Sequence, residues 1–142
     1  MKFYNISNHP SSAWEEKQIA SARNLVADTD GEEYFVPGKI VDIPFPSVDP
    51  EWSVREIKEA ARKILQHFPQ RYPDDGQGHG GRHAIMVMGE FTLSYMLIEE
   101  LLKRGWRVYA ATTHLWKHRI KGKGSTFANF RQYSTLSSRD LN

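Results

Sequence analysis

The residues with the widest chemical range lie in two short segments of the chain. The first, Ser7 to Pro10, offers a hydroxyl, an amide and an imidazole in a row. Asn8 and His9 can both hydrogen-bond a base or a phosphate, and histidine titrates near neutral pH. The simpler interpretation is a helix-start turn in which Ser7 or Asn8 caps the helix. Both interpretations are open at this stage.

The second segment is Thr112-Thr113-His114, with Lys117 close behind it. The imidazole of His114 suits a general acid or a donor to phosphate, and a lysine stabilises negative charge. Threonine is an ordinary strand residue, so the two threonines alone do not distinguish a binding loop from the end of a strand. The histidine is therefore the stronger signal in this segment.

Gly89 and Glu90 join an apolar stretch directly to a helical pattern, with Thr92 one residue further on. Glycine permits a tight turn, and the helix start offers free N–H groups that suit a phosphate. A carboxylate at Glu90 would repel a phosphate. It can instead satisfy the helix end, or accept a hydrogen bond from a sugar hydroxyl or an adenine amino group. A plain strand-to-helix turn also fits, since neither G-x-G-x-x-G nor a Walker loop is present.

Several common sites are absent from the sequence. The chain has no cysteine, which excludes disulfides, a cysteine nucleophile and thiolate zinc sites. The Gly-x-Ser-x-Gly turn of serine hydrolases is also missing. Asp74, Asp75, His79 and His83 lie in and beside a glycine-rich stretch that gives no rigid ligand geometry. We therefore expect neither a metal nor another cofactor.

Hydrophobic periodicity predicts the elements that position these residues. Apolar patterns indicate four main strands, over residues 1–6, 39–43, 84–88 and 106–111. Helices are expected over residues 12–26, 53–68 and 90–104, the last closed by Gly105. Ser12 with Glu15, and Ser53 with Glu56, form capping boxes at the first two helix starts. A short extra strand at 34–36 follows a polar turn at 28–33, and residues 69–82 are expected to form a loop.

The order β-α-β-α-β-α-β predicts an α/β fold with a Rossmann-like, mainly parallel sheet in a single domain, residues 1–142. Residues 116–120 and 126–133 flank Gly122-Lys123-Gly124 and predict a C-terminal β-hairpin. Ligands of parallel sheets bind at the carboxyl ends of the strands. Four loops should therefore share one rim: residues 7–10, 44–47, 89–92 and 112–114.

Composition and charge narrow the class of protein. The chain has 142 residues, of which 39% are hydrophobic and 25% charged, as in globular domains. Neither a signal peptide nor a membrane-length apolar run is present, so we expect a cytoplasmic protein without membrane contact. Residues 115–142 hold six lysines and arginines against one aspartate. This basic segment either faces a polyanion or is a solvated hairpin, and charge alone favours the second.

Three stretches of the sequence resemble a known family. They read FYNISNHPSSAW, GKIVDIPFPSVDPEW and VMGEFTLSYMLIEELLKRGWRVYAATT. They are similar to the small CRISPR-associated proteins of type III systems, which have a CARF-like Rossmann core and include the ring nuclease group, acting on cyclic oligoadenylates. The resemblance covers most of the chain and omits residues 69–82. Relatives often carry an acidic or basic residue after the Thr-Thr pair, where this chain has His114.

The resemblance implies a homodimer whose two rims form a symmetric pocket for cyclic tetra-adenylate, an RNA ring that its 2′-hydroxyls distinguish from DNA. It also implies metal-independent cleavage, in which a 2′-hydroxyl attacks its own phosphate. On this hypothesis the ligand contacts are Ser7, Asn8, Phe45, Gly89, Glu90, Thr92, Thr112 and Thr113. His9 and His114 are the acid and base candidates and Lys117 stabilises charge. Phe45 or Trp116 would stack on an adenine.

Other functions stay open on the sequence alone. The same fold would serve a non-catalytic sensor or sponge that binds the ring and holds it. It would equally serve another nucleotide-binding regulatory domain, or a protein-interaction module that uses the basic hairpin as its contact surface. The sequence does not separate these functions, because a small displacement of one histidine decides between binding and cleavage.

Overall fold

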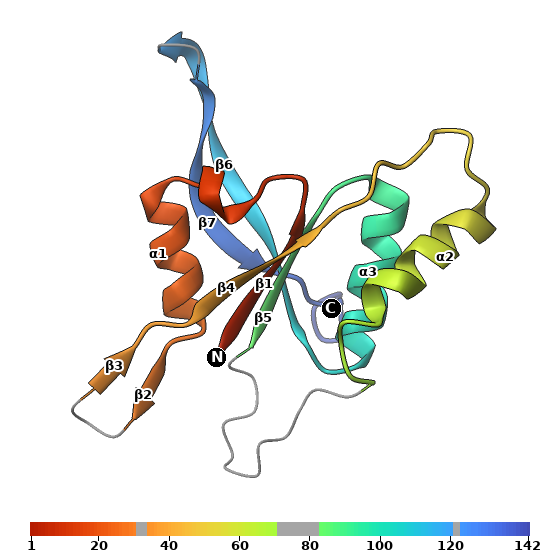
Figure 1. Ribbon diagram of the computed structural model, residues 1–142, viewed down its shortest axis with the longest axis horizontal. Helices are drawn as coiled ribbons and strands as arrows, with labels where there is room; N and C mark the ends of the chain where they lie inside the picture. Colours follow the sequence, from red (N-terminus) through yellow and green to blue (C-terminus); the bar gives the residue numbers. More distant parts are fainter. Residues whose placement is uncertain (31–33, 71–82, 121–122) are drawn as a thin grey trace.

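The computed structural model describes residues 1–30, 34–70, 83–120 and 123–142, so the predicted loop at 69–82 falls mostly outside the described residues. The main sheet has five strands in the order β4-β1-β5-β6-β7 (Figure 1). They are β1 (Lys2–Ser7), β4 (Lys39–Pro44), β5 (Ala84–Met88), β6 (Arg107–Ile120) and β7 (Lys123–Gln132). The first four are parallel, and β7 is antiparallel to β6. The predicted α/β fold with a mainly parallel sheet is confirmed.

Three helices connect the parallel strands. α1 (Glu16–Leu25) covers one face of the sheet, and α2 (Val54–Leu65) and α3 (Phe91–Lys103) cover the other (Figure 1). The chain passes from β1 through α1 to β4 on one side, then through α2 to β5 on the other side of β1. The winding therefore reverses between β1 and β5. In open α/β sheets, ligands bind outside the carboxyl ends of the strands at such a switch point.

Each face of the sheet has its own hydrophobic core. Ile85 and Val87 of β5 belong to the cluster under α2 and α3, whereas Ala84 and Met86 belong to the cluster under α1. Successive side chains of a strand point to opposite faces. A strand buried on both faces therefore needs an unbroken apolar run, which is the pattern at residues 84–88.

The start of the first helix differs from the prediction. Ser11–Ala13 form a short 3-10 helix, and α1 begins only at Glu16, with Glu15 at its N-cap and no side-chain hydrogen bond there. The predicted capping box of Ser12 and Glu15 is therefore wrong. Trp14 explains the difference, because its buried ring packs edge-on against Phe3 and holds the chain extended between the two helices.

The second and third helices follow the sequence pattern more closely. The hydroxyl of Ser53 accepts a hydrogen bond from the backbone N–H of Glu56 at 3.3 Å, which confirms the predicted cap of α2. α2 ends at Leu65, three residues before the predicted end. Gly105 closes α3 as predicted, with φ at 87°, and its N–H donates to the carbonyl of Leu102 at 3.0 Å.

The largest departure from the prediction lies in β6. Residues 106–111 and 116–120 were predicted as separate strands with 112–114 as a loop between them. They form one strand, Arg107–Ile120, because β7 pairs with it beyond the point where its parallel neighbour β5 ends. The predicted C-terminal hairpin is confirmed, with longer strands than expected. A parallel strand needs hydrogen-bond partners over its whole length, and here an antiparallel partner supplies them.

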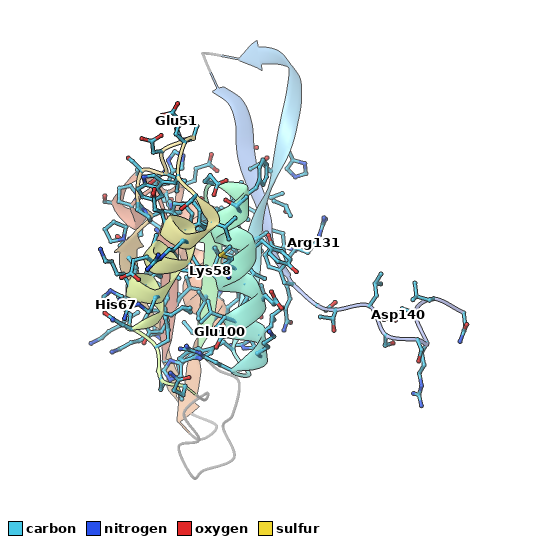
Figure 2. The ribbon with its side chains drawn as sticks, turned by 90° about the vertical axis from the view of Figure 1, so that its right-hand side faces the viewer. Glu51, Lys58, His67, Glu100, Arg131 and Asp140 are labelled. Carbon is cyan, nitrogen blue, oxygen red and sulfur yellow. The ribbon has the colours of Figure 1, made fainter. Side chains whose placement is uncertain are left out.

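Two further features lie outside the main sheet. β2 (Asp28–Asp30) and β3 (Tyr34–Val36) pair antiparallel in a small second sheet. The expected extra strand at 34–36 is confirmed, whereas 28–30 was predicted as a turn. After β7, residues 133–142 leave the body of the protein as an extended tail (Figure 2). Among the described helices, none combines the length and apolarity that crossing a bilayer requires.

Candidate functional site

A pocket of about 540 Å³ lies at the carboxyl ends of β1 and β5, against the middle of β6 and beside the start of α1. We call it the rim pocket. Its lining residues are Ser7, Asn8, His9, Ala13, Trp14, Glu15, Gln18, Met86, Met88, Gly89, Ala111, Thr113, Thr126 and Phe127. Five residues that the sequence proposed for one site meet here: Ser7, Asn8, His9, Gly89 and Thr113. The volume is in the range of small-molecule sites.

The turn that carries His9 is held by hydrogen bonds to its backbone. The His9 carbonyl accepts from the Asn5 amide at 2.8 Å and from the Trp14 indole N–H at 3.2 Å. The hydroxyl of Ser7 donates to Asn5 Oδ1 at 2.6 Å and accepts from the His9 N–H at 3.2 Å. Asn5 is 1% exposed and Ser7 is 7% exposed, so water competes little for these bonds. The backbone of His9 is thereby fixed, while its exposed side chain lines the pocket.

Sequence reasoning missed the residue at the centre of this network. Asn5 Nδ2 also donates to Asp42 Oδ1 at 2.9 Å. The carboxylate of Asp42 accepts in turn from the hydroxyl of Ser11 at 2.9 Å and from its backbone N–H at 3.2 Å. The available signal was an amide inside an otherwise apolar strand, because a buried polar side chain needs partners. Asn5 and Asp42 together attach the β1–α1 connection to β4.

Gly89 lies against the ring of Phe45. A Cβ atom at residue 89 would come within 2.6 Å of three Phe45 ring atoms. The glycine therefore permits close packing at the end of β5. Phe45 is 4% exposed and belongs to the core under α2 and α3. The expected stacking of Phe45 on a base does not fit this position, because the ring is covered by the core.

The start of α3 is satisfied by its own N-cap residue. The carboxylate of Glu90 accepts from the backbone N–H groups of Thr92 at 3.0 Å and Leu93 at 2.9 Å, and from the Thr92 hydroxyl at 2.7 Å. These hydrogen bonds lower the pKa of Glu90, and the one from the Leu93 N–H contributes most. The carboxylate thus occupies the place that a phosphate would take at this helix end. Of the roles considered for Glu90, the structure shows the helix cap, and neither Glu90 nor Thr92 lines the rim pocket.

β6 divides its three candidate residues between two faces. Thr113 lines the rim pocket with Ala111, two residues away, and strand alternation places Thr112 and His114 on the opposite face. Thr112 Oγ1 donates to the carbonyl of Asn129 in β7 at 3.0 Å. The predicted meeting of His9 and His114 in one site is therefore not formed. The expectation failed because residues 112–114 pair with β7 as part of a strand and do not form a loop around the pocket.

The side chains of Lys117 and Trp116 lie outside the described residues. The charge-stabilising role of Lys117 and the stacking role of Trp116 therefore stay predictions. The predicted loop 44–47 begins at the end of β4, and none of its residues lines the rim pocket.

The chemistry of the rim pocket follows from its described lining. His9 and Glu15 are its two ionisable side chains, and sequence reasoning had assigned Glu15 to a helix cap. Trp14 and Met86 line the pocket from the core, at 9% and 2% exposed, and Met88, 41% exposed, offers a thioether that packs well on an aromatic ring. Within the described residues, no three His, Asp or Glu side chains gather as metal ligands. The lining fits an aromatic heterocycle with polar substituents better than a bare phosphate.

Comparison with known proteins bears on the whole fold. No curated protein and no solved structure shows detectable similarity to the chain. A protein family does match, over residues 1–131, and this range contains every residue that lines the rim pocket. Because the match covers nearly all of the main sheet and its three helices, the chain belongs to the Uncharacterized protein MJ1673 family.

Proposed function

We propose that the rim pocket binds an adenine nucleotide and that its ligand is a cyclic oligoadenylate, with cyclic tetra-adenylate as the first candidate. One observation carries the proposal: residues from the ends of β1 and β5 and from β6 meet in one pocket beside the strand-order switch. Ligands of α/β sheets bind at this place. The resemblance to the CARF-like ring nuclease group of type III CRISPR-associated proteins supplies the identity of the ligand.

Apolar and polar lining residues would bind different parts of an adenosine. The exposed thioether of Met88 would pack against one face of an adenine. Around it, Asn8 and Gln18 offer amide donors and acceptors, and Glu15 offers acceptors for an exocyclic amino group or a ribose hydroxyl. A 2′-hydroxyl contact would make the site select RNA over DNA.

The size of the ring bears on the number of chains that hold it. A pocket of about 540 Å³ suits a small molecule, whereas a ring of four nucleotides is larger than such a site holds. The proposal therefore includes a homodimer, with one ring bound for every two chains. Calorimetric titration measures this ratio directly, and one ring per chain would contradict this part of the proposal.

Cleavage would follow the 2′-hydroxyl route. The 2′-oxygen forms a bond to the adjacent phosphorus and the bond from phosphorus to the 5′-oxygen breaks, which leaves a 2′,3′-cyclic phosphate and a 5′-hydroxyl. In this proposal Glu15 takes the proton of the 2′-hydroxyl and His9 gives one to the 5′-oxygen. Glu15 replaces His114 in the pair because it shares the pocket with His9. Acid–base assistance of this kind contributes about 10²–10⁴-fold.

The test is incubation of the purified protein with cyclic tetra-adenylate in EDTA, followed by chromatography of the products. We expect linear fragments ending in cyclic phosphate, and a loss of about 10²-fold or more in rate for His9→Ala and for Glu15→Gln. His67→Ala is the matched control, because His67 is an exposed histidine outside the pocket. An intact ring that also fails to bind would refute the proposal.

A second candidate, binding without cleavage, is favoured by the separation of His9 from His114. With one imidazole in the described pocket, the protein would serve as a sensor or sponge for the ring. Tight binding by calorimetry with no products after long incubation would select this function. A thermal-shift screen of other nucleotides covers the remaining alternative, since a ligand at 100 times its Kd stabilises a protein by about 2.7 kcal/mol.

A further inference from the structure

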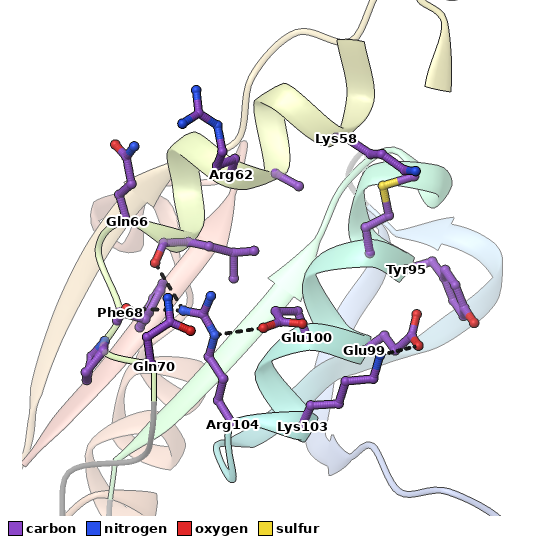
Figure 3. A pocket seen from close by; sticks show the side chains of 14 residues that line it. Lys58, Arg62, Gln66, Phe68, Gln70, Tyr95, Glu99, Glu100, Lys103 and Arg104 are labelled. Carbon is purple, nitrogen blue, oxygen red and sulfur yellow. Dashed lines mark hydrogen bonds and ion pairs between the residues drawn. The ribbon is translucent and has the colours of Figure 1, made fainter. Parts of the chain in front are cut away.

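A second cavity, of about 680 Å³, lies between α2 and α3 on the face of the sheet away from α1 (Figure 3). We call it the α2–α3 groove and define it by Lys58, Leu65, Phe68, Tyr95, Met96 and Lys103. Its floor is apolar, and its walls carry charged side chains. None of its lining residues belongs to the rim pocket.

The groove has a fixed shape because Arg104 ties its two walls together. The guanidinium side chain is 10% exposed and bonds to Glu100 at 3.0 Å within α3. It also donates to the carbonyls of Leu65 at 3.4 Å and Phe68 at 3.2 Å, at the end of α2 (Figure 3). A rigid groove loses little entropy when it receives a partner segment.

Apart from Val54 at the start of α2, the described residues leave large apolar side chains exposed in two places. One set surrounds the start of α3 and includes Tyr95, 67% exposed, on the wall of the groove. The other set is the tail, residues 133–142, where Leu136 is 76% exposed and Leu141 is 71% exposed. Figure 2 shows the tail running away from the body of its own chain, with Asp140 far from the helices. The described residues therefore leave both tail leucines largely uncovered.

The tail is shaped to present these leucines. Tyr133 anchors its start, with its N–H on the carbonyl of Val108 at 2.8 Å. Further on, the carboxylate of Asp140 accepts from the Ser137 N–H at 2.8 Å and from its hydroxyl at 3.0 Å, which closes a turn between Leu136 and Leu141. The tail thus holds two exposed leucines on either side of one hydrogen-bonded turn, where a partner surface could cover both.

We propose that the tail of one chain docks in the α2–α3 groove of a second copy, so that two chains exchange tails. Leu136 and Leu141 would lie on the apolar floor. The charges allow this placement, because Asp140 would lie opposite Lys58, and Arg139 would lie beside Glu99 and Glu100, which already pair with Lys103 and Arg104. Reciprocal exchange gives a closed two-fold dimer with two identical contacts.

The mass of the protein assembly in solution gives the first test of tail exchange. We expect a mass near twice 16.4 kDa by light scattering and sedimentation, without any nucleotide. Leu136→Asp with Leu141→Asp, and separately Tyr95→Glu, should raise the dimer Kd at least tenfold. Val54→Asp is the matched control, because Val54 is 63% exposed and lies outside the groove and the tail. A wild-type monomer up to about 100 µM, or a dimer that the tail variant leaves unchanged, overturns the proposal.

A cross-link separates exchange from docking within one chain. The sequence has no cysteine, so Tyr95→Cys and Leu141→Cys can be introduced in separate chains, one of them tagged, and mixed under mild oxidation. Exchange predicts a disulfide-linked pair that contains both variants, and Val54→Cys in place of Tyr95→Cys should give none. No mixed pair would overturn the proposal. Because the groove is separate from the rim pocket, this result stands or fails independently of nucleotide binding.

Discussion

Replacing Asn5 by alanine tests whether one buried amide holds the His9 turn in place. The side chain is 1% exposed and makes three hydrogen bonds, to the His9 carbonyl, to Asp42 and from Ser7. Alanine removes all three and leaves the His9 carbonyl and the Ser7 hydroxyl with fewer partners. The loss of packing contacts contributes less to the change in stability than the loss of hydrogen bonds, because alanine lacks only the small amide group of asparagine.

The size of the effect follows from these bonds. A buried neutral hydrogen bond contributes about 0.5–1.5 kcal/mol net and one to a charged group about 1.5–3 kcal/mol. We place the bond to Asp42 at the low end, because Asp42 is exposed and its charge is screened. The Ser7 hydroxyl keeps its second acceptor, the His9 carbonyl at 3.1 Å. Asn5→Ala should therefore lower the free energy of unfolding by about 2–4 kcal/mol.

Urea unfolding, followed by tryptophan fluorescence, measures the change. Asn24→Ala is the control, because Asn24 is an exposed asparagine of α1 outside the network, and it should change stability by less than about 0.5 kcal/mol. Asp42→Asn keeps an acceptor oxygen for Asn5 and should cost less than Asn5→Ala. An Asn5→Ala protein within about 0.5 kcal/mol of wild type would refute the reasoning, since the three bonds would then contribute nothing net.

Three further substitutions test other parts of the structure. Gly89→Ala forces a Cβ onto the Phe45 ring and should lower the free energy of unfolding in urea by about 1–3 kcal/mol. Adding Phe45→Leu should restore part of this stability, and a double variant as unstable as Gly89→Ala would contradict the packing argument. Gly105→Ala should cost about 1–2 kcal/mol, because residue 105 has φ at 87°, and an unchanged midpoint would argue against that conformation. Glu90→Gln should lower the melting temperature at neutral pH. The native pKa of Glu90 is below its ordinary 4.5, so its contribution is present above pH 4.5 and lost as pH falls through the native value. The gap in melting temperature between wild type and Glu90→Gln should therefore close as the pH falls below 4.5 and through the native pKa, and a gap independent of pH would exclude the charged cap.

The sequence predicted those parts of the fold that local patterns determine. The run at 84–88, the Ser53 cap and the closing Gly105 each depend on residues a few positions apart, and the structure has all three. The position of the rim could also be predicted, because the carboxyl ends of parallel strands lie along one edge of the sheet. Two of its predicted segments, residues 7–10 and 89–92, accordingly contribute residues to the rim pocket, and Thr113 of a third segment does so from within β6.

The failures have a common physical cause in contacts between distant segments. Ser12 and Glu15 have the residue types of a capping box, but burial of Trp14 against Phe3 and Phe130 sets the backbone there instead. Thr112 to His114 have the types of a rim loop, but pairing with β7 keeps them in a strand. Neither contact is visible in a window of neighbouring residues, because in each case a partner lies far along the chain.

The two proposals differ in how widely they should apply. All the lining residues of the rim pocket lie within residues 1–131, the range that matches the family, whereas Leu136 and Leu141 lie beyond it. A ligand site that arises from the strand order and from the Asn5 network depends on the shared fold, so nucleotide binding should extend to other members of the family. Tail exchange depends on residues outside the matched range. We therefore expect a member that lacks the two leucines to bind the same ring between two chains but to be monomeric without nucleotide, which makes ring binding and ligand-free dimerisation separable properties of the family.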